Sequence, residues 1–103
     1  MTARLNRVRT NVLEIAYLED GDANGAPVVL VHGFPDDAST WSSVAPALVA
    51  AGHRVLMPYV RGFGPTRFLD ESTPRSGQIA ALGQDVIDFA DALNLQRYLL
   101  VGH

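Results

Sequence analysis

The sequence predicts an α/β fold in which an antiparallel pair of strands is followed by parallel strands with helices on both faces. The expected elements come in the order strand, strand, strand, helix, strand, helix, strand, an alternation typical of a parallel sheet. The runs 27–31 and 54–58 are largely apolar on both faces, as strands covered by helices on both sides are. Residues 79–93 carry an apolar stripe at helical spacing, which indicates an amphipathic helix.

The first two elements are expected to be strands that pair along one edge of the sheet. Residues 4–10 predict a weak, exposed strand. Residues 12–18 alternate better, with Leu13, Ile15 and Tyr17 on one side. The polar segment 19–25 contains two glycines and is expected to form a turn.

The remaining elements are a strand, a helix, a strand, a long surface loop, a helix and a last strand, expected over residues 27–31, 43–51, 54–58, 59–77, 79–93 and 97–101. Ser42 or Ser43 is the N-cap candidate of the first helix, and Gly52 ends it. Ser76 can cap the second helix, and Asn94 can take the left-handed conformation at its end.

Length, composition and charge describe an ordinary globular chain. Its 103 residues fit one domain, with 48% apolar and 18% charged residues. The net charge of −3 gives no reason to expect nucleic acid or a membrane surface as partner. No apolar run is long enough to span a bilayer, and the N-terminus lacks the apolar core of a secretion signal. Since there is also no cysteine, we expect a cytoplasmic protein without disulfides or thiolate metal sites.

The loop His32-Gly33-Phe34-Pro35 is the main candidate site. It follows a buried strand, so it lies at the carboxyl edge of the sheet, where open α/β sheets bind ligands. Gly33 allows close backbone approach and Pro35 removes one donor, which leaves the N–H of Phe34 to face a developing negative charge. The pattern fits a tight turn with a buried His32 bonded to backbone groups equally well. Trp41 could line a pocket beside this loop, although anchoring the first helix is favoured.

Other motifs carry less chemistry. The segment Arg61–Gly64 lacks the third glycine and the following helix of a dinucleotide site, so a structural turn is expected. Asp85, Asp88 and Asp91 are expected on the solvated side of the second helix. The three histidines are far apart without ligand spacing, and neither a metal nor a cofactor is expected.

Taken together, these segments resemble the opening part of an α/β-hydrolase. The resemblance covers the chain from about residue 10 and rests on segments in the family's order: Val29–Pro35, Trp41, Gly52–Pro58, Arg61–Gly64 and Leu99–His103. The His-Gly-Phe-Pro loop is most similar to that of epoxide hydrolases and fluoroacetate-dehalogenase-type enzymes, and some cofactor-free esterases and perhydrolases share it. The apolar run into Gly102-His103 resembles the lead-in to a nucleophile elbow.

The resemblance implies roles for particular residues. Phe34 would supply one backbone N–H of an oxyanion hole, the rest of 32–35 would shape that loop, and Gly102 and His103 would lead into the elbow. The next residue is Asp in the epoxide hydrolase and dehalogenase branch and Ser in the esterase branch. Residues 1–103 are therefore expected to be the N-terminal part of a single hydrolase domain, inactive alone, that stops one position before its nucleophile and lacks the cap and C-terminal half.

The sequence departs from the family's pattern at two positions, of which the first bears on how the loop is anchored and the second argues against haloalkanes as substrates. Tyr59 stands where Asp is usual, and Phe34 stands where haloalkane dehalogenases commonly have a halide-binding Asn. The implied activity is hydrolysis of a small-molecule substrate through a covalent intermediate, with an Asp nucleophile favoured over Ser. The alternatives are a Ser-nucleophile esterase or perhydrolase, a non-catalytic small-molecule receptor of the same fold, and an interaction module. The last strand, apolar on both faces, is expected to pair with the remainder of the fold, in the same or a second chain.

Overall fold

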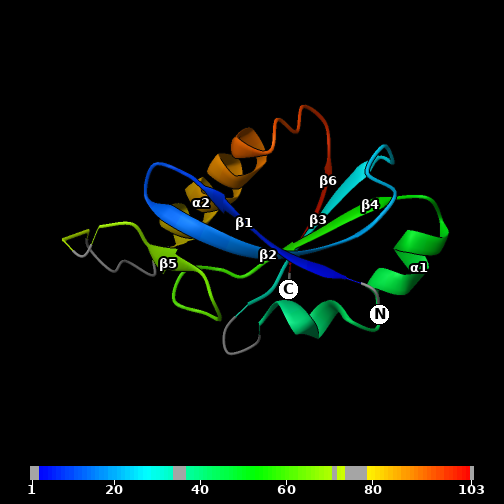
Figure 1. The fold of residues 1–103 in the computed structure, drawn as a ribbon, viewed down its shortest axis with the longest axis horizontal. Coiled ribbons are helices and arrows are strands. Elements are labelled where there is room, and N and C mark those ends of the chain that lie inside the picture. Colours follow the sequence, from blue (N-terminus) through cyan, green and yellow to red (C-terminus); the bar gives the residue numbers. More distant parts are fainter. Residues whose placement is uncertain (1–2, 34–36, 71, 74–78, 103) are drawn as a thin grey trace.

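The computed structural model describes residues 3–33, 37–70, 72–73 and 79–102. The strands are β1 (Arg4–Arg9), β2 (Leu13–Gly21), β3 (Pro27–Val31), β4 (Arg54–Pro58), β5 (Arg67–Phe68) and β6 (Leu99–Gly102). The helices are the 3₁₀ helix η1 (Ala38–Trp41), α1 (Ala45–Ala50) and α2 (Ile79–Ala92). The strands form one sheet of order β1-β2-β4-β3-β6, and the short β5 also pairs with β2 (Figure 1).

The sheet is mixed, as the sequence predicts. β1 and β2 are antiparallel and occupy one edge, whereas β3 runs parallel to both β4 and β6. In Figure 1, α2 lies on one side of the sheet and α1 and η1 lie on the other. The predicted α/β class, with an antiparallel first pair and helices on both faces, is confirmed.

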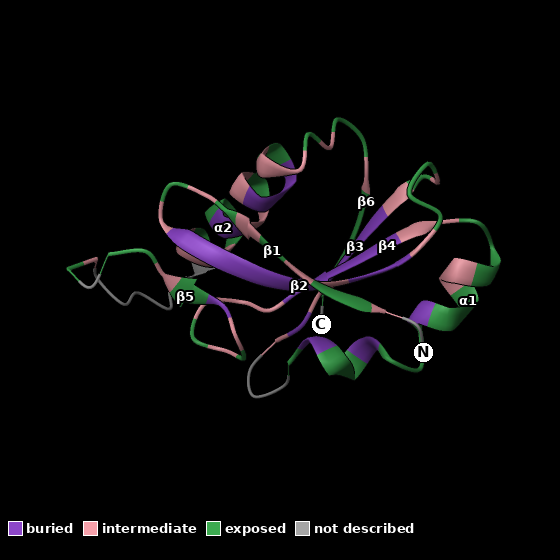
Figure 2. Ribbon diagram, in the orientation of Figure 1, coloured by how far each residue is buried: buried purple, intermediate pink, exposed green. Residues whose placement is uncertain are grey.

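Alternate residues of the central strands belong to two separate cores, which is why these strands read as apolar on both faces. Figure 2 shows that β2, β3 and β4 are buried over most of their length. The core beneath η1 and α1 comprises Val28, Leu30, Ala38, Trp41, Ala45, Val55 and Met57. The core beneath α2 comprises Leu13, Ile15, Tyr17, Val29, Leu56 and Phe89. The expected apolar side of β2 therefore faces α2, where the rings of Tyr17 and Phe89 meet edge to face at 5.2 Å.

The first helical segment is divided and shorter than expected. Asp37 accepts the N–H of Ser39 at 2.8 Å and starts η1 well before the expected helix. Ser42 closes this turn by donating its N–H to the Ser39 carbonyl at 3.0 Å. The N-cap of α1 is Val44, without a side-chain cap, so the predicted capping by Ser42 or Ser43 is wrong. The early cap at Asp37 draws these serines into the connection between η1 and α1.

The helix ends agree with the sequence. Gly52 after α1 and Asn94 after α2 adopt positive φ values of 92° and 57°. In both cases the N–H of the next residue bonds the carbonyl five residues earlier, at 3.1 Å for His53 and 2.9 Å for Leu95. Ser76, the predicted cap of the second helix, lies outside the described residues.

β2 is longer than expected, because the polar segment 19–25 does not turn at its start. The strand continues to Gly21, paired with Arg54 on β4. The Glu19 carboxylate is buried, and it accepts Arg54 Nε at 2.8 Å and Asn6 Nδ2 at 3.3 Å. These partners compensate the charge, so an acidic residue is tolerated inside the strand.

The segment 59–77, expected to be a surface loop throughout, contains β5. Its Phe68 lies opposite Leu13 on β2, and its Arg67 lies opposite Glu14. Arg67 also reaches the Glu14 carboxylate at 3.2 Å. The pairing depends on partners more than fifty positions away in the chain, which the local pattern does not show.

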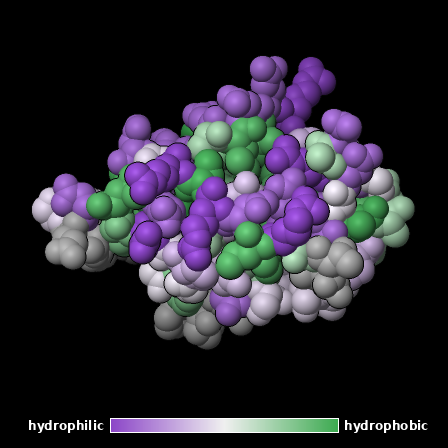
Figure 3. Space-filling model, viewed as in Figure 1, coloured by the Kyte–Doolittle hydropathy of each residue, from purple (hydrophilic) through white to green (hydrophobic). Residues whose placement is uncertain are grey.

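The last strand begins two residues later than expected, at Leu99, and reaches Gly102. Among the described residues it pairs with β3 alone and forms the edge of the sheet. Leu99, Leu100 and Val101 are 61%, 56% and 42% exposed. These are three consecutive exposed apolar residues. On the face of the molecule shown in Figure 3, hydrophobic areas are instead interspersed with hydrophilic side chains. No described helix has both the length and the apolar character needed to cross a membrane.

Candidate functional site

The two segments of the predicted site follow β3 and β6, which are neighbouring parallel strands. β3, β4 and β6 are parallel, so their carboxyl ends lie at the same edge. Val31, the last residue of β3, is the register partner of Gly102, the last residue of β6. The entry to the His32-Gly33 loop therefore lies next to the predicted lead-in to the elbow. Phe34, Pro35 and His103 lie outside the described residues, and their roles stay predictions.

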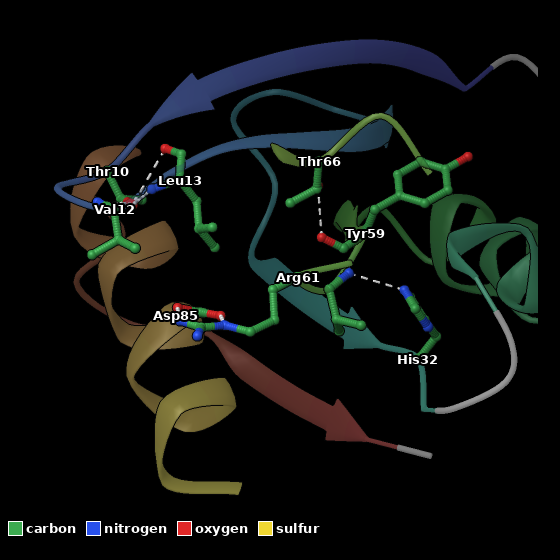
Figure 4. A network of polar contacts seen from close by, with 9 residues as sticks. Thr10, Val12, Leu13, His32, Tyr59, Arg61, Thr66 and Asp85 are labelled. Atoms are coloured by element: carbon green, nitrogen blue, oxygen red, sulfur yellow. Dashed lines mark hydrogen bonds and ion pairs between the residues drawn. The ribbon is translucent and has the colours of Figure 1, made fainter. Parts of the chain in front are cut away.

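His32 is held by backbone groups on both ring nitrogens, and Figure 4 shows the bond at Nε2. Its side chain is buried, Nε2 lies 3.0 Å from the N of Val60, and Nδ1 lies 3.3 Å from the Gly33 carbonyl oxygen. Because the Val60 N–H can only donate, Nε2 is the acceptor, and the bond pattern assigns the ring proton to Nδ1. His32 thus links the end of β3 to the segment after β4, and both of its ring nitrogens are engaged in these structural contacts.

Aromatic rings enclose His32. The Phe63 ring lies edge to face at 5.3 Å between centroids, and the Tyr59 ring lies at 6.3 Å. Tyr59, which occupies the position where the family usually has Asp, packs partly against the core beneath α1. Burial and the negative charge of Asp37 raise the pKa of its hydroxyl. A neutral ring therefore stands where the family would place a charge.

The segment from Tyr59 to Thr66 is a closed turn fixed at both ends. The buried Thr66 hydroxyl donates to the Tyr59 carbonyl at 2.8 Å (Figure 4) and accepts the Ala16 N–H at 3.0 Å. Gly64 has φ 51°, and a Cβ there would lie 2.4 Å from the Tyr59 ring. These contacts support the structural-turn interpretation of Arg61–Gly64.

Arg61 and Asp85 form a largely buried ion pair. Arg61 Nε and a terminal nitrogen of the guanidinium bond the two carboxylate oxygens at 2.6 and 2.7 Å, and the side chains are 11% and 12% exposed. The hydrogen bond to Asp85 raises the pKa of Arg61. The guanidinium carbon also lies 5.2 Å from the Phe68 ring centroid.

The expectation that Asp85 lies on the solvated side of the helix is wrong. Asp85 comes three residues after Leu82 and four before Phe89, so it flanks the apolar stripe of α2 and faces the sheet. Asp91, by contrast, is exposed as expected. The spacing within the helix contained this signal, whereas the partner, 24 positions earlier, did not follow from the sequence.

A small apolar cavity adjoins the ion pair. With Arg61 and Asp85 it is lined by Leu13, Ile15, Val31, Pro58, Tyr59, Val60, Leu82, Val86 and Phe89. Such surroundings screen charges weakly, which strengthens the attraction within the pair. Trp41 lies elsewhere, buried in the core with Leu30 and Met57, where it anchors η1 to the sheet. Its role as a pocket wall stays a prediction.

In the described part of the site, the polar side chains are engaged in structural contacts, and the edge of β6 is exposed. Both ring nitrogens of His32 are engaged, and Arg61 is neutralised by Asp85. Across the described ranges, no group of three or more His, Cys, Asp or Glu side chains could hold a metal ion. The arrangement can hold a backbone loop beside the end of β6. The sequence pattern indicated that loop but neither the bond from the Val60 N–H to His32 nor the Arg61–Asp85 pair beside Val60.

Comparison with known proteins identifies the fold family. The model of the alpha/beta hydrolase fold family matches residues 26–103. Epoxide hydrolase A of Mycobacterium tuberculosis is 34% identical over 99 residues, which is 93% of this chain and 29% of that protein. A haloalkane dehalogenase of Mycobacterium marinum is 42% identical over 62 residues, or 56% of this chain and 21% of that protein.

The crystal structure of a protein from Klebsiella pneumoniae subsp. pneumoniae superposes on this chain with a TM-score of 0.93 and 44% sequence identity. The aligned part covers 96% of this chain and 33% of the Klebsiella protein. The chain thus spans about a third or less of the length of these relatives. The family match and the sheet order agree: this chain belongs to the alpha/beta hydrolase fold family.

Proposed function

We propose that this chain is the N-terminal part of a hydrolase that acts on a small molecule through a covalent intermediate. The observation that carries the proposal is the register of Gly102 beside Val31. With this register, the segment that we propose to lead into a nucleophile elbow ends beside the loop that begins at His32. A nucleophile that follows His103 would then face the backbone N–H of Phe34.

An Asp nucleophile fits the epoxide hydrolase relative best. Its carboxylate oxygen attacks an epoxide carbon, the ring C–O bond breaks, and the ring oxygen takes up a proton. Water activated by a histidine from later in the fold then adds to the ester carbonyl. The Phe34 N–H donates to the oxyanion formed in this second step, and collapse releases a diol and the carboxylate.

A Ser nucleophile is the second candidate, because the same loop serves acyl transfer equally well. Serine would attack an ester carbonyl, and the Phe34 N–H would stabilise the first tetrahedral intermediate. Haloalkane dehalogenation is less favoured despite the Mycobacterium marinum relative. Phe34 stands where those enzymes commonly place a halide-binding Asn.

The exposed β6 strand fits the same proposal. Its three apolar side chains and unpaired edge are suited to another strand and a covering helix. We expect the remainder of the hydrolase fold to pair there.

The test is a turnover panel on the full-length protein that carries this chain. The substrates are an aryl epoxide, p-nitrophenyl acetate and fluoroacetate. Diol formation from the epoxide supports the Asp enzyme, and nitrophenol release alone supports the Ser enzyme. Saturable binding of these compounds without turnover of any of them would contradict the proposal and would support the alternative function, a non-catalytic small-molecule receptor.

A further inference from the structure

The Arg61–Asp85 pair is connected to the candidate site by one residue. Arg61 follows Val60 directly, and the Val60 N–H is the group that bonds His32 Nε2 at 3.0 Å. Asp85 holds the Arg61 side chain through two parallel bonds, which fix both distance and direction. A side-chain contact with α2 therefore lies one residue away from the Val60 N–H.

The remaining contacts of this segment leave it few alternative positions. Its two ends are tied through Thr66, which bonds both the Tyr59 carbonyl and β2. The Phe63 and His32 rings pack edge to face. On the other side of His32, Nδ1 faces the carbonyl of Gly33, so a shift of the ring would be passed to the backbone there.

We propose that Arg61 and Asp85 are positioning residues, which set the geometry of the His32-Gly33 loop entry through the Val60 N–H. The inference rests on the proposed function, because the loop matters for turnover only if it serves an oxyanion. A buried pair of this kind is weak evidence for stability by itself, since desolvation offsets much of the attraction. We assign the pair a role at the site because its two bonds fix the direction of the Arg61 side chain and because Arg61 is adjacent to Val60, which bonds His32.

A second ion pair provides a matched control. Arg54 Nε bonds Glu19 at 2.8 Å, with side chains 21% and 8% exposed, and joins β4 to β2 near the opposite end of β4. Arg→Lys at either position keeps the charge and loses the planar fork. Arg61→Lys and Arg54→Lys therefore make the same chemical change, and only the first lies next to Val60.

The experiment compares both variants in the full-length protein. We expect Arg61→Lys to lower kcat about tenfold or more with little change in KM, because misplacing a group remote from the chemistry slows the reacting step. Arg54→Lys should leave kcat within about twofold. Both should lower the thermal midpoint by a similar few degrees. Equal kcat values in the two variants would overturn the proposal.

A readout without substrate separates this inference from the proposed function. In ¹⁵N spectra of the His32 ring, Arg61→Lys should move the Nε2 signal, and the Val60 amide should exchange about tenfold faster. Arg54→Lys should change neither. If the protein hydrolyses nothing, these signals still decide the inference, and unchanged His32 signals in Arg61→Lys overturn it.

If Arg61→Lys does not fold, Asp85→Asn, which keeps the side-chain shape, takes its place in both measurements. If neither variant folds while Arg54→Lys does, the pair is only a folding element and the proposal is wrong.

Discussion

The N–H of Val60 donates to Nε2 of His32 at 3.0 Å, and this bond joins the segments that follow two neighbouring parallel strands. The register of β3 and β4 explains the contact. Val29 lies beside Leu56, so the residues that follow each strand emerge at nearly the same level. The His32 ring can therefore accept the hydrogen bond of the Val60 N–H.

Replacing His32 by Phe should destabilise the full-length protein by about 1–3 kcal/mol. The ring contacts with Phe63 remain, but the buried Val60 N–H loses its acceptor. Denaturant unfolding measures the change. His53→Phe is the control, because His53 Nδ1 meets the Ala26 carbonyl in an exposed position and should cost less than about 1 kcal/mol. Equal losses of unfolding free energy in both variants would mean that the hydrogen bond to His32 stabilises the protein no more than the exposed contact of His53.

Replacing Phe34 by Pro in the full-length protein removes the backbone N–H at that position. If the N–H serves an oxyanion, kcat should fall by about a hundredfold or more. Phe34→Ala, which keeps the N–H and changes only the side chain, is the control and should retain most of the turnover. Steady-state kinetics on the best substrate measures both. Unchanged turnover in Phe34→Pro would remove this residue from the site.

Gly21→Ala and Gly52→Ala compare two glycines with nearly the same positive φ, 88° and 92°. A Cβ at Gly52 meets nothing within 4 Å, so we expect a loss of about 1–2 kcal/mol from the backbone conformation alone. A Cβ at Gly21 would lie 2.1 Å from the His53 carbonyl oxygen, and the clash raises the loss to about 3 kcal/mol or more. Denaturant midpoints of the two variants measure the difference, and similar losses would contradict the extension of β2 to Gly21.

The Asp37 carboxylate should titrate at an unusually low pH. Hydrogen bonds from the Ser39 hydroxyl and N–H lower its pKa below the ordinary value. Because the pKa is lower in the folded state than in the unfolded state, Asp37 stabilises the fold above its ordinary pKa. That contribution disappears as the pH falls through the folded-state value.

Carbon-detected NMR titration of Asp37 tests this assignment. Ser39→Ala should move the pKa of Asp37 back towards its ordinary value, because the stronger of the two bonds is lost. Ser43→Ala changes a nearby exposed serine and should leave it unmoved. A pKa that is the same in all three proteins would refute the cap.

Local patterns predicted the parts of the fold that depend on near neighbours. Runs 27–31 and 54–58 matched their strands because burial on both faces leaves a continuous apolar sequence. Gly52 and Asn94 marked the helix ends because few other residues adopt the left-handed conformation.

Long-range partners explain what the sequence did not predict. The extension of β2 depends on Glu19 finding Arg54, 35 positions later. Burial of Asp85 depends on Arg61, although its place beside the apolar stripe of α2 was visible in the spacing. At the candidate site, the sequence indicated the His32-Gly33 loop and Gly102 as candidates, whereas their adjacency follows only from the register of β3 and β6.

Trapping the proposed covalent intermediate tests the position of the proposed nucleophile most directly. The full-length protein is mixed with an aryl epoxide or with a fluorophosphonate, quenched in acid, digested, and analysed by mass spectrometry. We expect an adduct on the residue that follows His103, formed with the epoxide if that residue is Asp and with the fluorophosphonate if it is Ser. No adduct with either reagent, or an adduct elsewhere in the chain, would contradict this expectation.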